Sequence, residues 1–202
     1  ALYTGGGLVD IVKLEKAATA NGDSLYLGIA QVMEGALMGT GADIFGDLVY
    51  TQALQGTPNP TLDDQLTVYD SVQKVLSAAI TNMAATGPTN IGPAAADLTF
   101  GGASTASAQA AAWTAMAHTL KARFYMHTAE KNGTPAYQSA LNEAKLGIMS
   151  DAGNYFGAFD DANHPNEANF DYQFHGTAGR GGDRAAAGGR GAGRRRRERG
   201  GG

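Results

Sequence analysis

Residues 106–131 carry the most regular helical pattern of the chain and read ASAQAAAWTAMAHTLKARFYMHTAEK. Apolar side chains recur there every three or four residues, the spacing that places them along one face of an α-helix. The residues on this inward face are Trp113, Met116, Ala117, Leu120, Phe124 and His127. The stretch therefore predicts one long helix with a buried stripe, which Asn132 and Gly133 would end.

A second helix is predicted over residues 135–149, directly after this stop. Pro135 suits the first turn of a helix, where its missing backbone N–H is not needed. The expected inward face consists of Tyr137, Ala140, Leu141, Ala144 and Ile148. Because the connection is so short, the two helices should be antiparallel neighbours. Small alanines where they approach make the pair similar to one tetratricopeptide-type unit.

Earlier in the chain the same spacing predicts helices over residues 24–40 and 64–85, and another that begins near Leu8. Gly39 or Gly41 is expected to end the first of these. Glycine and proline are frequent in the segments between the helices, which indicates ordered loops. The sequence thus predicts a mainly α fold, a tetratricopeptide-like array of α-α units with long loops.

Charge is divided unevenly along the 202 residues of the chain. Residues 1–175 carry 17 acidic and seven basic side chains, whereas residues 176–202 carry eight arginines and two acids. An acidic body lacks the clustered cations that phosphate binding needs, so specific nucleic-acid binding is not expected. The second segment has no large apolar residue from which to build a core. We therefore predict a helical body over 1–175 and a Gly/Arg-rich tail over 176–202, which could contact an acidic partner.

No arrangement of side chains in the sequence indicates catalysis or a bound metal. The chain contains no cysteine, which removes thiol nucleophiles and thiolate metal sites. His118 and His127 are nine residues apart, which places them on opposite sides of a helix. Asp43 and Asp47 have the side chains of a glycosidase acid–base pair, but nothing in the sequence fixes their separation. The expectation is a protein that is not an enzyme and has no catalytic residues, no cofactor and no metal site.

Aromatic residues near the end of the body are the best candidates for contact with a ligand. They are Tyr155, Phe156, Phe159, Tyr172 and Phe174. Aromatic rings are common in ligand sites, and the C–H groups of sugar faces pack well on them. These five could equally pack over the ends of the helices. Trp113 lies on the inward stripe instead and is predicted to belong to the core.

Three stretches follow one another in an order typical of a known family. Residues 43–53, DIFGDLVYTQA, are similar to a run in which a helix ends at D-x-x-G-D-x-P-Y-x-E-A. Residues 68–80 look like a helix of the pattern I-Y…L-x-x-A-I, and residues 97–126 like D-x-x-Y-x-G-D…W…N-S-L-K-x-R. The positions that depart from these patterns are Val49, Gln52, Ala103 and His118. On these motifs, which span roughly residues 24–150, the chain resembles the SusD/RagB-like family of surface lipoproteins.

The resemblance implies a non-catalytic subunit that binds an oligosaccharide or a peptide at the cell surface. It implies a partner, a TonB-dependent (SusC-like) transporter of the outer membrane, and a scaffold of tetratricopeptide-like units. It also implies that Asp43 and Asp47 cap and shape a turn. Family members are typically more than twice this length, so the resemblance implies a fragment or a truncated relative, with the signal peptide and lipidation cysteine upstream. The alternative left open is a structural or interaction subunit of a larger assembly.

Overall fold

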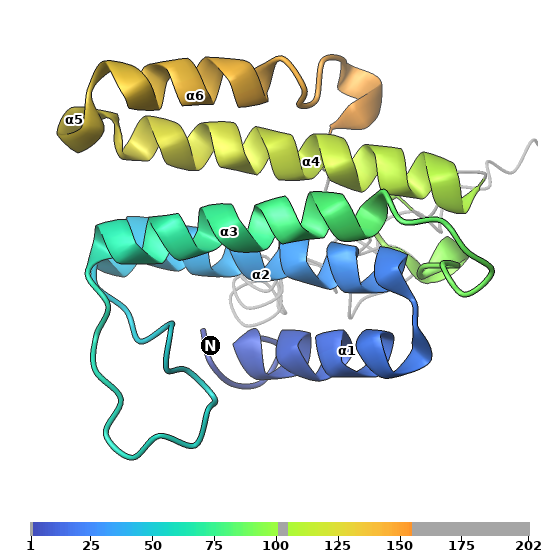
Figure 1. Ribbon diagram of the computed structural model, residues 1–202, viewed down its shortest axis with the longest axis horizontal. Coiled ribbons are helices and arrows are strands. Elements are labelled where there is room, and N and C mark those ends of the chain that lie inside the picture. The colour runs from blue at the N-terminus through green and yellow to red at the C-terminus, as the bar shows by residue number, and fades with distance from the viewer. Residues whose placement is uncertain (1, 101–104, 155–202) are drawn as a thin grey trace, which may run out of the picture. The chain divides into compact units, whose positions relative to one another are not determined.

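The computed structural model describes residues 2–100 and 105–154, and these residues form a helical body (Figure 1). Its helices are α1 (Leu8–Asn21), α2 (Ser24–Phe45), α3 (Gln65–Met83), α4 (Ala106–His127), α5 (Ala129–Asn132) and α6 (Thr134–Ala144). Short 3-10 turns lie at Ala94–Ala96 and Asp151–Gly153. Within the described residues no strand forms, and Leu48 and Asp63 pair only as an isolated antiparallel bridge. The predicted mainly α fold is confirmed.

Successive helices run antiparallel and pack side by side: α1 on α2, α2 on α3, α3 on α4, and α4 on α6 (Figure 1). The helix α2 also contacts α4, so it lies at the centre of the array. All of these elements belong to one compact unit, Ala1–Phe156. The packing of α4 on α6 confirms the antiparallel pair that the short connection between them predicted.

Polar side chains fix where the helices begin. Asp23 accepts a hydrogen bond from the backbone N–H of Tyr26 at the start of α2, and Asp64 accepts one from Thr67 at the start of α3. At the start of α4, the hydroxyl of Thr105 accepts one from the Ala108 N–H. Each cap satisfies a donor that the first turn of a helix leaves unpaired.

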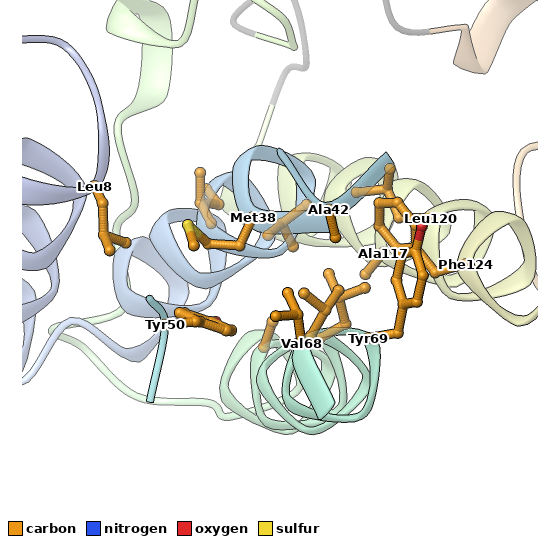
Figure 2. Close-up of a cluster of buried hydrophobic side chains, with 14 of the residues drawn as sticks. Leu8, Met38, Ala42, Tyr50, Val68, Tyr69, Ala117, Leu120 and Phe124 are labelled. Carbon is orange, nitrogen blue, oxygen red and sulfur yellow. The ribbon is translucent and has the colours of Figure 1, made fainter. Parts of the chain in front are cut away.

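The core lies where α2, α3 and α4 meet. Figure 2 shows Met38 of α2, Val68 of α3 and Phe124 of α4 gathered around one centre. All three side chains are fully buried. Of the stripe predicted for residues 106–131, the buried members are Trp113, Ala117, Leu120 and Phe124. Met116 is half-buried, and His127, the last residue of α4, is exposed.

The prediction that Gly39 or Gly41 ends the second helix was wrong. The helix α2 continues through both glycines to Phe45 and ends at Gly46, whose φ is +75°. Both glycines are buried, and a Cβ on Gly39 would collide with the ring of Phe124. Gly39 therefore serves close approach between α2 and α4, which outweighs the low helix propensity of glycine.

Gly39→Ala is expected to destabilise the body by about 1–3 kcal/mol. The added methyl group must displace the buried ring of Phe124, and this cost exceeds the gain in helix propensity of about 1 kcal/mol. Urea denaturation followed by circular dichroism measures the loss. In a Phe124→Leu background, where the end of the ring is absent, the same substitution should cost clearly less. Equal losses in the two backgrounds would show that the contact does not limit packing.

The helices after residue 105 are shorter than predicted. The first ends at His127, where the chain turns at Thr128 into α5, and the second ends at Ala144 instead of residue 149. Of the inward face predicted for the second, Ala140 is buried, but Tyr137 and Leu141 are exposed. The buried face consists of Ala136 and Ala140. These alanines let α6 approach α4 closely, and this turns the large neighbouring side chains outward.

Candidate functional site

The five aromatic residues proposed as ligand contacts lie outside the described residues. They are Tyr155, Phe156, Phe159, Tyr172 and Phe174. The predicted tail, 176–202, also lies outside them. Within the described residues, the candidate sites are therefore the carboxylates of the motifs and the hollows of the helical body.

Asp43 joins three helices at one end of the body. Its carboxylate accepts hydrogen bonds from the Tyr69 hydroxyl (2.6 Å) and the Arg123 guanidinium (2.8 Å). The ring Nδ1 of His127 lies 2.6 Å from the same carboxylate. Only 17% of the Asp43 side chain is exposed, although it carries a charge. Burial raises the pKa of Tyr69, and the hydrogen bond to Asp43 adds to this, so the hydroxyl remains a donor.

Asp47 acts at the start of the next helix. Its carboxylate accepts a hydrogen bond from the backbone N–H of Gln65, the first residue of α3, at 3.0 Å. Asp63 closes the same loop by accepting from the backbone N–H groups of Tyr50 and Thr51. Burial raises the pKa of Asp63, but the hydrogen bonds from Thr51 and Tyr50 outweigh it and hold the pKa below its ordinary value. The carboxylates of this segment thus shape a turn and do not form an acid–base pair.

Asp97 is a second buried anchor, in the third of the motifs. Its Oδ2 accepts hydrogen bonds from the Trp113 indole N–H (2.6 Å) and the Gln109 amide (3.1 Å). Its Oδ1 accepts from the backbone N–H groups of Thr99 and Phe100. Trp113 is buried, as its place on the stripe predicted. This network fixes the segment before α4 against the core, and it occupies the tryptophan that could otherwise have stacked on a sugar.

The two histidines of α4 are engaged separately. His118 lies 2.6 Å from Glu143 of α6, and His127 lies beside Asp43 of α2. In the part of the chain that the structure describes, no group of three or more His, Cys, Asp or Glu side chains could hold a metal ion. Their spacing of nine residues places the two imidazole rings on opposite sides of α4.

One hollow of the body is an open groove of about 770 Å³ between α1, α2, α4 and residues 93–99. Apolar side chains cover most of it, among them Ile11, Leu37 and Met116, and the polar groups at its surface include Tyr26 and Asp97. On its rim Leu98 is 82% exposed and Met33 is 43% exposed. This lining suits apolar groups better than sugar hydroxyls, which need hydrogen-bond partners.

Sequence reasoning missed the groove. The sequence pattern that points to the groove lies in α2. There Met33 and Leu37 widen the apolar face of the helix beyond the stripe that one partner helix can cover. The pattern shows that more apolar surface exists than a single packing face needs. It does not show whether a neighbouring helix covers that surface.

Comparison with known proteins supplies the wider context. A family model described as SusD-like, starch-binding and associating with the outer membrane matches residues 1–176. Among solved structures, a SusD/RagB family protein from Bacteroides thetaiotaomicron aligns over 83% of this chain and 35% of its own, at 23% identity and a TM-score of 0.61. Comparison with curated proteins gives no significant match.

Two further solved structures share the fold. A SusD homolog from Bacteroides uniformis aligns over 88% of this chain and 34% of its own, at 22% identity and a TM-score of 0.63. A chitin-binding SusD homolog from Flavobacterium johnsoniae aligns over 73% and 30%, at 17% identity and a TM-score of 0.60. The chain thus spans about a third of the length of these structures, and the tetratricopeptide-like α-α fold predicted for it is confirmed. None of the described helices has the length and apolar character needed to span a bilayer.

Proposed function

We propose, from the premise that this chain belongs to the SusD-like family, that it binds a nutrient glycan or peptide without breaking it down. Members of the family are non-catalytic binding proteins. The observation that carries the proposal is the family match over residues 1–176, in which Asp43 and Asp97 occupy the family-like motifs as buried structural anchors. Asp43 holds helices together and Asp97 fixes the segment before α4 against the core, so both carboxylates serve the scaffold.

The proposed partner is a TonB-dependent (SusC-like) transporter in the outer membrane, with this chain at the cell surface. The description of the family as starch-binding and associating with the outer membrane supports this proposal. The aromatic residues that remain candidates for ligand contact are Tyr155, Phe156, Phe159, Tyr172 and Phe174. They fall within the residues that the family model matches.

Isothermal titration calorimetry of the whole chain with starch and with chitin oligosaccharides tests the proposal. We expect saturable binding and no release of shorter products. The triple variant Tyr155→Ala, Phe156→Ala and Phe159→Ala should weaken binding at least about tenfold, a loss of about 1.4 kcal/mol. Tyr137→Ala, which removes an exposed aromatic ring from α6, is the matched control and should bind as the wild type does. Hydrolysis of either glycan would contradict the proposal, and undiminished binding by the triple variant would refute the assigned contacts.

The second candidate function is a structural or interaction subunit of a larger assembly. One observation favours it, the open apolar groove of about 770 Å³. A charge placed in the groove by Met33→Glu should then weaken association with the neighbouring subunit of that assembly. It should leave glycan binding unchanged if the aromatic contacts are correct. The Gly/Arg-rich tail, 176–202, is proposed as a separate element that contacts an acidic partner.

A further inference from the structure

Three groups that ionise as acids meet between α1, α2 and the loop that follows α2. The Tyr50 hydroxyl donates a hydrogen bond of 2.7 Å to Oε1 of Glu34 in α2. The carboxyl group of Glu15 in α1 lies within hydrogen-bonding reach of Glu34. Its Oε1 is buried and has no hydrogen-bond partner among the described residues. A buried carboxylate without a partner is strongly disfavoured, so a proton must be held within this cluster.

The described segments that border this cluster supply no cation in place of that proton. Residues 17–73, which include all of α2 and the loop containing Tyr50, have no lysine, arginine or histidine. The segment 84–100, which also borders α1, has none either. On α1 itself, Lys13 pairs with Asp10 on the exposed side and Lys16 is exposed. Among the described residues, the carboxylate that faces Glu15 is therefore Glu34, which disfavours the ionisation of Glu15, while Tyr50 stays protonated.

We propose that a proton held between Glu15 and Glu34 latches α1 onto α2, and that loss of this proton in alkaline solution releases α1 from the body. Two carboxylates at hydrogen-bonding distance repel each other once both are charged. Tyr50 already donates to Glu34 and cannot supply a second proton. The helix α1 provides Ile11 and Leu14 to the groove, so its release would also remove one wall of that groove.

The direction of the pH dependence follows from the cluster. Burial, with the adjacent Glu34, raises the pKa of Glu15 from its ordinary value of 4.5 to about 8. The docked state therefore binds a proton that a released α1 would lose. The stabilisation is complete below pH 4.5 and disappears as the pH rises through about 8. Burial and Glu34 also raise the pKa of Tyr50, so its hydroxyl stays protonated in this range.

Hydrogen–deuterium exchange of the whole chain, corrected for the intrinsic pH dependence of exchange, tests the latch. Between about pH 6.5 and about pH 9.5, protection of peptides from residues 8–21 should fall roughly 30-fold, because the lower pH lies about 1.5 units below the pKa of the docked state and no further stabilisation is lost above that pKa. Peptides from residues 65–83 should change less than about twofold over the same range. In Glu15→Gln, which cannot ionise, the α1 peptides should keep their protection.

Further variants separate the latch from general effects of charge. Glu34→Gln should also abolish the loss of protection, and it provides the same test if Glu15→Gln does not fold. Glu130→Gln, at an exposed position of α5, should behave as the wild type does. The proposal is overturned if α1 of the wild type stays protected at the upper pH. It is equally overturned if protection falls as much in the Glu15 and Glu34 variants as in the wild type.

Discussion

Replacing Phe124 by alanine is expected to reduce the free energy of unfolding by about 3–5 kcal/mol. The ring is fully buried where α2, α3 and α4 meet. It stacks on Tyr69 with a centroid distance of 5.9 Å and fills the space that Gly39 leaves open. Alanine would leave a cavity that no neighbouring side chain can fill, because the surrounding helices are fixed by their own contacts. Urea denaturation followed by circular dichroism measures the loss.

Met126→Ala is the matched control for this prediction. Met126 lies on the same helix two residues later, but 49% of it is exposed, so its truncation should cost less than about 1 kcal/mol. Leu120→Ala, at a second buried position of the stripe, should cost about 2–5 kcal/mol. Losses of similar, small size at all three positions would mean that the stripe of α4 does not face the core.

Helical periodicity was enough to predict which segments form the body, because amphipathic spacing is a local property of the sequence. It located both ends of α3 to within two residues, and it placed the starts of α1, α2 and α4 at the residues where these helices begin. It failed where a residue acts through a distant partner. Gly39 appeared to end a helix, since the sequence gives no sign that Phe124, 85 positions later, needs the space.

The same limit applies to α6 and to the candidate sites. Ala136 and Ala140 form the buried face because α4 approaches closely there, whereas hydrophobicity alone favoured the larger Tyr137 and Leu141. The motif resemblance did locate Asp47 at the turn before α3. Asp43 lies instead in the last turn of α2, and the resemblance could not show that it contacts Arg123, 80 residues away. The acid cluster around Glu15 combines side chains from three segments, and no pattern in any one of them reveals it.

Replacing Glu143 by glutamine is expected to cost about 3–5 kcal/mol, because it breaks a nearly buried ion pair by removing one partner. Glu143 on α6 lies 2.6 Å from the Lys121 ammonium and 2.6 Å from the His118 ring. The exposed fractions of the Lys121 and Glu143 side chains are only 11% and 17%. Glutamine keeps the shape of the side chain but leaves the lysine charge without compensation. Its main effect should be loss of α6 from α4.

Two comparisons isolate the ion pair in this prediction. The double variant Lys121→Met, Glu143→Gln removes both charges and should recover most of the loss, since an apolar replacement of a buried pair is often neutral. Glu130→Gln, at an exposed acid of α5, should cost less than about 0.5 kcal/mol. Urea denaturation at neutral pH supplies all three values. A Glu143→Gln loss that persists in the double variant would assign the effect to lost shape or hydrogen bonding and not to the stranded charge.

The pH dependence gives an independent check on the same pair. Burial raises the pKa of Glu143, but Lys121 and His118 outweigh it and hold the pKa below its ordinary value of 4.5. The stabilisation is therefore present above pH 4.5 and is lost as the pH falls through the lowered pKa, when the carboxyl group of the folded protein takes up a proton. The difference in stability between the wild type and Glu143→Gln should shrink in that acidic range, because the protonated carboxyl and the amide are both neutral. A difference that stays constant across the acidic range would mean that the charge of Glu143 does not hold α6 in place.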